Sequence, residues 1–369
     1  MMDGTLVKEQ RGSRRQSGMP TINDVASLAG VSPMTVSRVI NGEKNVRATT
    51  RDAVMAAIET LNYAPNRAAQ SLAGAAQIRM GLLYSNPSAG YLSEFLVGSL
   101  DQASGAGVQL VVEKCEPNDH EADVALGLIK SGIDGLILPP PLCDSEAVIA
   151  LLLEKGIPAV AVATARPADR LSTVSVDDHR ASFEMTRYIA SLGHRRIGFI
   201  GGDDNLSASE RRLIGYRDAL EAENIPFDPD LVAPGLFTYR SGLDAAERLL
   251  DVDARPTAIF AANDDMAAAT VAVAHRRHLD VPRDLTVCGY DDTTLATAIW
   301  PELTTVRQPV ADMSRAAIRL LVEEIRRHRE GKRVEPQQVV QDFTLIRRES
   351  SGPPRRPPTR RRKTPSVPA

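Results

Sequence analysis

The sequence predicts an α/β protein in which a small helical head precedes two doubly wound parallel α/β lobes. Three observations support this fold class. The chain has 369 residues, which is more than one average domain needs. A helix-turn-helix pattern stands near the N-terminus. Behind it, short apolar segments alternate with amphipathic helical ones, and the 43% hydrophobic and 25% charged residues are typical of a globular protein.

Charge is distributed unevenly along the chain. Residues 1–74 carry nine Lys and Arg against six Asp and Glu, and residues 347–369 carry eight against one, although the net charge is −3. A basic head on an acidic body favours a protein that meets phosphate groups with one end only. We expect residues 1–18 and the Pro- and Arg-rich residues 349–369 to be disordered, and non-specific attraction to DNA or RNA is the alternative for the tail.

Simple features argue against several classes of protein. No apolar run reaches the roughly 18 residues of a membrane span, and no apolar stretch of a secretory signal follows the basic N-terminus. Cys115, Cys143 and Cys288 lie far apart without a CxxC motif, so neither a disulfide framework nor a zinc site is indicated. We therefore expect a cytoplasmic protein that uses no metal or cofactor and no membrane.

The head begins with two short helices in the segment 21–41. Thr21 and Asp24 have the spacing of a capping box at a helix start. Gly30 stands where the helix ends with a positive φ. Ser32 and Pro33 then provide the N-cap and first position of a second helix.

The second helix has one buried and one outward face. Its apolar residues Val36, Val39 and Ile40 are expected to pack inward. The outward side chains are Met34, Thr35, Ser37 and Arg38. Two helices joined by a Gly-containing turn form a helix-turn-helix, whose second helix enters the DNA major groove. The alternative is an ordinary helical hairpin with a polar outer face.

A third helix and a short fourth one complete the head. Thr49 or Thr50 can cap a helix whose apolar residues follow the spacing i, i+3, i+4, i+7 from Val54 to Leu61. This places a helix-turn-helix domain at 19–65. In the hinge and linker 66–77, residues 66–74 are expected to form a helix of about two turns, which is too short to be stable without DNA or a second copy.

The rest of the chain alternates between two kinds of segment. The expected strands are Met80–Ser85, Val108–Glu113, Gly135–Leu138, Ala159–Ala163, Ile197–Gly201, Ala258–Ala262 and Leu285–Gly289. The expected helices include Leu92–Ala103, Asp178–Leu192, Ser209–Glu223, Tyr239–Leu250 and Asp264–Arg277. Buried strands that alternate with helices indicate parallel, doubly wound sheets.

The head also resembles a known family. The residues that carry the resemblance are Asp24-Val25-Ala26, Ala29-Gly30-Val31-Ser32, Thr35 to Val39, Leu61-Asn62-Tyr63, Pro65-Asn66 and Leu72-Ala73. They look like the head and hinge of the lactose-repressor family of transcription regulators. Four later phrases, Gly193 to Gly202, Ala261 to Asp264, Gly289 to Asp292 and Leu303 to Val306, resemble the family's effector core, which is similar to periplasmic sugar-binding proteins.

The resemblance implies a domain plan. The effector-binding domain takes residues 78–348, with lobe one at about 78–175 and 310–337 and lobe two at about 176–306 and 338–348. Three crossovers join the lobes and form a hinge around a ligand cleft. No heptad-like C-terminal helix stands here, so a homodimer is expected rather than a tetramer.

The resemblance also implies the DNA contacts. Family members bind a palindromic operator as dimers, with the hinge helices in the minor groove. Bases are expected to be read by Pro33, Met34 and Arg38, of which Arg38 can bond a guanine bidentately. The expected phosphate contacts are Thr21, Ser32, Thr35, Ser37, Asn41 and Tyr63. The expected minor-groove residues are Asn66, Ala69 and Leu72, with Leu72 as the wedge.

The expected effector contacts come from the same resemblance. They lie at strand ends, where open α/β sheets bind ligands, and are Ser85, Tyr91, Arg212, Phe237, Asn263, Asp291 and Gln308. Arg, Asp and Asn beside aromatic rings suit sugar hydroxyls, although family regulators that answer to purines use the same positions. Ala163 stands where the lactose repressor has a ligand-binding carboxylate, which puts the same ligand in doubt.

The predicted function is a repressor of carbohydrate uptake or catabolism genes, controlled by a small-molecule effector. A solute-binding protein and a sugar-processing enzyme are the alternatives. Three histidines, His194, His275 and His278, invite a metal or catalytic interpretation, but no carboxylate or Cys spacing completes a site. No nucleophile elbow, P-loop or GxGxxG motif is present, so no enzyme is expected.

Overall fold

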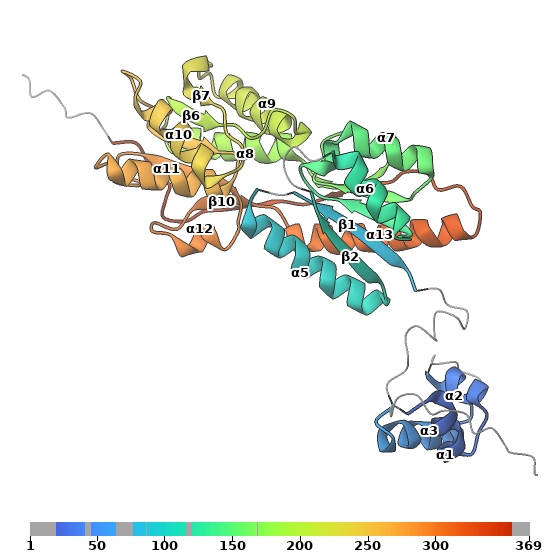
Figure 1. The fold of residues 1–369 in the computed structure, drawn as a ribbon. Coiled ribbons are helices and arrows are strands. Elements are labelled where there is room, and N and C mark those ends of the chain that lie inside the picture. The colour runs from blue at the N-terminus through green and yellow to red at the C-terminus, as the bar shows by residue number, and fades with distance from the viewer. Residues whose placement is uncertain are drawn as a thin grey trace, which may run out of the picture. The chain divides into compact units, whose positions relative to one another are not determined.

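A computed structural model describes residues 20–40, 46–63, 77–85, 87–115, 120–167 and 169–355, in two compact units, Met1–Gln77 and Ile78–Ala369. Figure 1 shows their elements. The predicted disordered N-terminus 1–18, the predicted hinge helix 66–74 and the tail from residue 356 onward lie outside the described residues. Among the described residues, no helix is both long enough and apolar enough to cross a membrane.

The head consists of α1 (Ile22–Ala29), α2 (Pro33–Ile40) and α3 (Ala48–Thr60) around a small apolar core. The Asp24 carboxylate accepts hydrogen bonds from the Thr21 backbone N–H and hydroxyl, both at 2.7 Å. Gly30 has φ 65°, and the Ser32 hydroxyl accepts from the Thr35 N–H at 3.2 Å. The helix-turn-helix prediction is therefore confirmed in its caps and its turn.

The predicted N-cap of α3, Thr49 or Thr50, is wrong by two or three residues. Thr49 and Thr50 already lie in the first turn, and the N-cap is Arg47, whose side chain makes no cap hydrogen bond. The Arg47 carbonyl accepts from the Arg51 N–H at 3.0 Å. Ala48, a strong helix former, extends the helix past the two threonines.

Lobe one contains a parallel six-stranded sheet in the order β11-β5-β4-β3-β1-β2. Its strands are β1 (Arg79–Tyr84), β2 (Gln109–Lys114), β3 (Gly135–Leu138), β4 (Ala159–Val162), β5 (Ser172–Val176) and β11 (Gln338–Gln341). Its helices are α5 (Ala89–Ala106), α6 (Glu121–Lys130), α7 (Glu146–Lys155) and α13 (Val310–Arg329), with the short 3-10 helix η1 (Leu142–Asp144). One apolar cluster joins α5 and α13 to the sheet, and another joins α6 and α7 to it.

Lobe two contains a second six-stranded sheet in the order β12-β10-β9-β8-β6-β7, parallel except for β12. Its strands are β6 (Ile197–Ile200), β7 (Val232–Ala233), β8 (Ala258–Ala261), β9 (Thr286–Asp291), β10 (Thr304–Arg307) and β12 (Thr344–Ile346). Its helices are α8 (Asp178–Ser191), α9 (Ser207–Ala222), α10 (Tyr239–Leu250), α11 (Asp264–Arg276) and α12 (Leu295–Ala298), with the 3-10 helix η2 (Pro229–Leu231). The predicted fold class is confirmed.

The chain passes three times between the lobes: from β5 to α8, from β10 to α13, and from β11 to β12. One predicted lobe boundary is wrong. Residues 338–341, expected in lobe two, form β11 beside β5 of lobe one, with Gln338 opposite Thr173. Both sheets offer an open edge to this exposed strand, so its sequence does not determine which sheet it joins.

The predicted start of the disordered tail, residue 349, is also wrong. Ser350 is fully buried, donates from its hydroxyl to the Val287 carbonyl at 2.6 Å and accepts from the Thr304 N–H at 2.8 Å. The Gly352 N–H donates to the Thr286 hydroxyl at 3.0 Å. Residues 349–355 therefore belong to lobe two, because their backbone groups continue its hydrogen bonding beyond β12.

Candidate functional site

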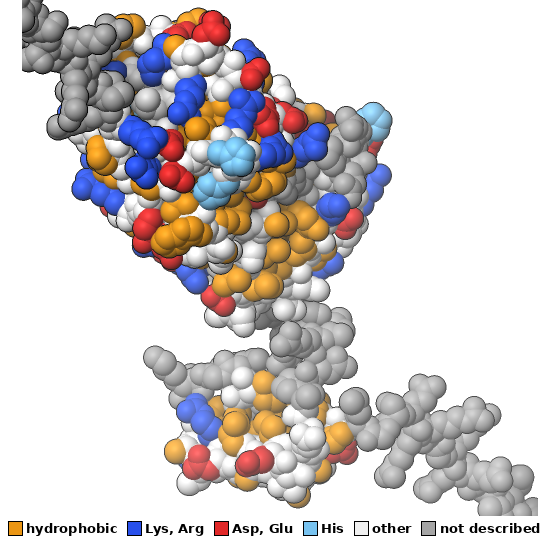
Figure 2. All heavy atoms as spheres, turned by 90° about the vertical axis from the view of Figure 1, so that its left-hand side faces the viewer, with side chains coloured by type: hydrophobic (Ala, Val, Ile, Leu, Met, Phe, Trp, Pro, Cys, Tyr) orange, Lys and Arg blue, Asp and Glu red, His pale blue; other side chains and the backbone are white. Residues whose placement is uncertain are grey.

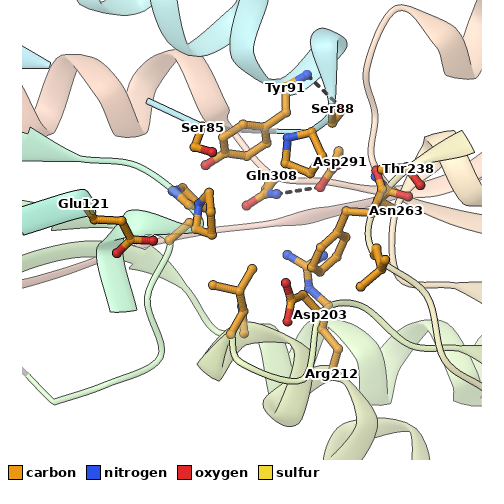
Figure 3. A pocket seen from close by; sticks show the side chains of 18 residues that line it. Ser85, Ser88, Tyr91, Glu121, Asp203, Arg212, Thr238, Asn263, Asp291 and Gln308 are labelled. Carbon is orange, nitrogen blue, oxygen red and sulfur yellow. Dashed lines mark hydrogen bonds between the residues drawn. The ribbon is translucent and has the colours of Figure 1, made fainter. Parts of the chain in front are cut away.

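A cavity of about 330 Å³ lies between the two lobes, at the carboxyl ends of their strands. All seven predicted effector residues line it: Ser85, Tyr91, Arg212, Phe237, Asn263, Asp291 and Gln308. Figure 3 shows these side chains converging on one space. Ala163 also lines the cavity, so an apolar methyl group stands at the position of the family's carboxylate.

The centre of the cavity wall is the buried Arg212 on α9. Its Nε donates to the Asp178 carboxylate at 2.7 Å and its Nη1 donates to the Ala262 carbonyl at 2.6 Å. Its guanidinium carbon lies 3.6 Å from the centre of the Tyr290 ring. Burial lowers the pKa of Arg212, but Asp178, Tyr290 and Asp291 together more than offset this, and the net shift of the pKa is upward. The side chain is thus held as a fixed cation with part of its fork left for a ligand.

Asp291 faces the cavity from the end of β9. Its Oδ1 accepts from the Gln308 side-chain amide at 2.6 Å. Burial raises the pKa of Asp291 to about 7, although nearby Arg212 and the Gln308 hydrogen bond act against the rise. The Gln308 Oε1 is buried without a hydrogen-bond partner among the described residues. This oxygen can accept a hydrogen bond from a ligand hydroxyl.

Two aromatic rings contribute most of the apolar lining. Tyr91 on α5 is 5% exposed, and its hydroxyl has no partner among the described side chains and backbone groups. Phe237 precedes α10, and its carbonyl accepts from the Asn263 amide at 2.9 Å. Asn263 also caps α11 by accepting from the Met266 N–H at 3.0 Å. A ring with an unpaired hydroxyl and a second flat ring suit the faces and hydroxyls of a small ring-shaped ligand.

Backbone strain gathers around the cavity. Positive φ angles occur at Ala163 (57°), Phe237 (58°), Asp291 (111°) and Asp292 (59°), where side chains other than Gly are disfavoured. Such strain persists only where surrounding structure holds it, and it clusters at functional sites. Three of these four residues line the cavity.

Sequence reasoning missed several lining residues, among them Ser88, Glu121, Pro140, Pro141, Asp203 and Thr238. Glu121 begins α6, where the sequence predicts no helix start, and its carboxylate accepts from the Ser145 hydroxyl. Asp203 follows the Gly201-Gly202 end of β6, and this strand-end position is a signal that could have identified it.

The predicted DNA-reading face is exposed on α2. Pro33, Met34 and Arg38 are exposed, with Met34 at 66%. The predicted phosphate contacts Thr21 and Ser32 are exposed, and Thr35 and Ser37 are half-buried. Tyr63, by contrast, belongs to the apolar core of the head at 9% exposure. Asn41, Asn66, Ala69 and Leu72 lie outside the described residues.

The three histidines do not come together in a site. Burial lowers the pKa of His194. Its Nε2 donates to the Gly352 carbonyl at 2.8 Å, and its Nδ1 accepts from the Thr257 hydroxyl at 2.8 Å. His194 thus holds residues 349–355 on lobe two. No cluster of three or more His, Cys, Asp or Glu that could hold a metal occurs in the described part of the chain.

Comparisons with known proteins match both parts of the chain. Residues 21–66 match the model for bacterial regulatory proteins of the lacI family, and residues 186–351 match a periplasmic binding protein-like domain. The HTH-type transcriptional regulator CelR of Thermobifida fusca is 36% identical over 338 residues, which cover 90% of this chain and 98% of CelR. The HTH-type transcriptional repressor PurR of Haemophilus influenzae is 31% identical over 85% of this chain and 93% of PurR.

Solved structures of regulators also match this chain. A complex of the regulator CelR with cellobiose matches with a TM-score of 0.69 and 35% identity, and covers 90% of this chain and all of that one (100%). The lac repressor dimer bound to operator and the anti-inducer ONPF matches with a TM-score of 0.74 and 28% identity, over 90% of this chain and 99% of that one. The relatives are regulators, not enzymes. The chain belongs to the lacI family of bacterial transcriptional regulators.

Proposed function

We propose that this chain represses genes of carbohydrate uptake or catabolism by binding a palindromic operator as a homodimer in the cytoplasm. A small-molecule effector in the cavity between the lobes switches it. The observation that carries the proposal is that one chain joins an exposed recognition helix to a cavity lined by all seven expected effector residues. Effector binding shifts the lobes between arrangements and thereby changes how the segments 66–77 of two copies meet DNA.

The cavity favours a neutral carbohydrate. Its volume of about 330 Å³ is at the small end of ligand pockets. Among the described residues, its charged lining consists of Glu121, Asp203, Asp291 and one cation, Arg212, which already pairs with Asp178. A phosphorylated sugar would meet more carboxylates than cations. Hydroxyl groups instead fit the free Gln308 oxygen and the Tyr91 hydroxyl.

An apolar surface supports the dimer. Val97 and Leu100 on α5 are 52% and 57% exposed, and Val112 on the edge strand β2 is 42% exposed. Figure 2 shows that hydrophobic side chains also gather on one face of the unit Ile78–Ala369, next to charged side chains. Exposed apolar residues beside an unpaired sheet edge are typical of an association surface.

Operator binding tests the DNA-reading role. We would select an operator from random duplexes with the wild-type protein and measure its affinity and that of a scrambled duplex at one salt concentration by fluorescence anisotropy. Because Arg38 is expected to bond a guanine, Arg38→Ala should cost about 1–3 kcal/mol on the operator and little on the scrambled duplex. Arg47→Ala, also exposed in the head, is the matched control and should leave the ratio of the two affinities unchanged. An unchanged ratio for Arg38→Ala would remove Arg38 from base reading.

A ligand screen tests the effector role. Thermal shifts would be measured with cellobiose, glucose, glucose 6-phosphate and hypoxanthine, followed by operator binding with each ligand that shifts the melting temperature. We expect a neutral sugar to bind and to change operator affinity. Gln308→Ala should weaken the binding of that sugar. Binding of hypoxanthine alone would replace the carbohydrate with a purine, and tight binding of glucose 6-phosphate would contradict the charge argument.

A further inference from the structure

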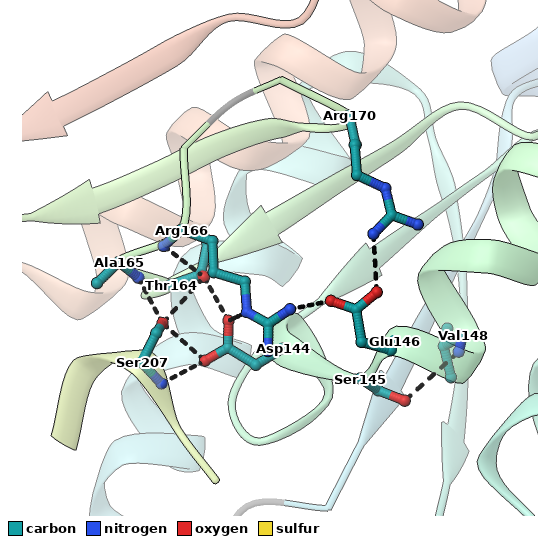
Figure 4. Close-up of polar contacts among 9 residues, drawn as sticks. All are labelled: Asp144, Ser145, Glu146, Val148, Thr164, Ala165, Arg166, Arg170 and Ser207. Carbon is teal, nitrogen blue, oxygen red and sulfur yellow. Dashed lines mark hydrogen bonds and ion pairs between the residues drawn. The ribbon is translucent and has the colours of Figure 1, made fainter. Parts of the chain in front are cut away.

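A compact hydrogen-bonded cluster joins the two lobes beside the cavity (Figure 4). Asp144, at the end of η1 in lobe one, accepts from the Ser207 N–H and from the Ser207 hydroxyl of lobe two, both at 2.8 Å and on Oδ2. The Ser207 hydroxyl in turn accepts from the Ala165 N–H of lobe one at 2.8 Å. The Thr164 hydroxyl of lobe one also lies 3.3 Å from the Ser207 hydroxyl, so four polar contacts cross from one lobe to the other at this point.

The cluster is fully paired on the lobe-one side. The Asp144 Oδ1 accepts from the Thr164 hydroxyl at 2.5 Å and lies 3.2 Å from the Arg166 Nε. The Asp144 side chain is 2% exposed, so separating the lobes would take its Oδ2 away from both donors of Ser207. Water would then have to replace them in a recess that keeps the carboxylate mostly covered.

The cluster adjoins the cavity lining in sequence. Thr164 follows the lining residue Ala163, and Ser207 stands between the lining residues Leu206 and Ala208. On another wall of the cavity, the Ser88 hydroxyl of lobe one donates to the Asp265 carboxylate of lobe two at 2.6 Å. The lobes are therefore tied on two sides of the space where a ligand would sit.

We propose that Asp144, Thr164, Ala165 and Ser207 form a latch that holds the lobes closed before any effector binds. The closed arrangement then has its own stabilising contacts, and the effector does not have to supply all the free energy of closure. The latch also has a consequence for effector affinity, which rests on the proposed function. Loss of the latch lowers the closed population and raises the apparent dissociation constant of the effector by the same factor.

Spin labels across the cleft test the latch in the full chain without a ligand. The three native cysteines are buried, so labels can be directed to Glu154→Cys on α7 and Arg211→Cys on α9. Double electron–electron resonance should give one narrow distance distribution for the otherwise wild-type protein. Adding Asp144→Asn and Ser207→Ala should broaden it toward longer distances. The backbone N–H of residue 207 should exchange with solvent about tenfold faster or more, because several hydrogen bonds are lost.

A matched control lies in the same cluster. Glu146 binds Arg166 and Arg170, which are all in lobe one, and its side chain is 59% exposed. Glu146→Gln should therefore leave the distances unchanged. If the double variant does not fold, Ser207→Ala alone is used instead, because it removes every cross-lobe contact of the cluster except the one that the Ser207 N–H makes with Asp144. The latch is disproved if the ligand-free wild type already shows mainly long distances, or if Ser207→Ala and the double variant both match the wild type.

Discussion

At the scale of single residues, the cavity is organised around a buried charge pair and a strained acid. Arg212 and Asp178 neutralise each other at 2.7 Å, both nearly inaccessible to solvent. Asp291, with φ 111°, is held by Gln308 opposite them. A ligand therefore meets donors and acceptors whose positions are set in advance, which reduces the free energy lost in ordering them.

The raised pKa of Asp291 predicts a pH dependence of stability. Burial raises this pKa to about 7, whereas the unfolded value is about 4. Between these values the folded protein binds the proton that the unfolded chain has released, so this carboxyl group lowers stability as the pH rises from about 4 to about 7. Asp291→Asn keeps an oxygen acceptor for Gln308 and removes the titration.

Melting temperatures of both proteins from pH 5 to pH 8 check this prediction. The melting temperature of Asp291→Asn relative to that of the wild type should increase as the pH rises and then level off above pH 7. If the melting temperatures of the two proteins changed with pH in parallel, Asp291 would not have a raised pKa in the folded protein.

The seven effector contacts could be predicted because they stand at positions that resemble the family's ligand contacts, and Ser85, Asn263 and Gln308 follow a strand within two residues. Asp203 could have been found from its position after β6, whereas Glu121 could not be predicted in this way. Glu121 reaches the cavity because α6 starts there and Ser145 holds its carboxylate. A contact made by tertiary placement, rather than by a local motif, leaves no pattern in the sequence.

At the scale of elements, α5 and α13 pack closely at Gly98. A Cβ atom at this position would lie 2.2 Å from the Ala311 carbonyl oxygen and 2.2 Å from the Ser314 Oγ. Gly98→Ala should therefore destabilise the core by about 1–3 kcal/mol, as an overpacked site does. Gly105, in the same helix, has open space where a side chain would stand, so Gly105→Ala should instead stabilise by up to about 1 kcal/mol.

The free energies of unfolding of Gly98→Ala and Gly105→Ala, measured in urea, check these two predictions. Both substitutions add the same methyl group to the same helix, so a difference in sign isolates the close approach of α5 and α13. Equal stabilisation by both would show that the two helices do not pack so closely in solution.

Long elements are predictable to within about two or three residues, because apolar spacing determines them. The helix Tyr239–Leu250 has the bounds that the sequence predicts. The two-residue β7 and the four-residue α12 are not among the predicted elements, because such short elements depend on their neighbours. The longer helices α6, α7 and α13 are not named among them either. Partners distant in sequence also determine which sheet β11 joins and where residues 349–355 pack. Thr173 lies opposite β11, and His194 holds the segment 349–355.

At the scale of the whole molecule, association of two copies is expected to determine operator affinity. The double substitution Val97→Asp and Leu100→Asp places two charges on the exposed apolar face of α5. We expect a monomer in analytical ultracentrifugation at micromolar concentration and a loss of at least about tenfold in operator affinity, since a monomer occupies one half-site at a time. Leu153→Asp on α7, at a residue 45% exposed, is the control and should remain a dimer. A dimeric double variant would place the association surface elsewhere.

The segment that holds Ser350 has a consequence for synthesis on the ribosome. We expect the head to fold once residues 20–63 emerge, because the core residues that the structure describes in it all lie between Ile22 and Tyr63. Lobe one requires α13 and β11, and lobe two requires β12 and the buried Ser350. Both lobes therefore remain incomplete until nearly all of the described chain has been made. We expect a nascent chain to have a folded recognition helix well before it has a cleft that can bind an effector.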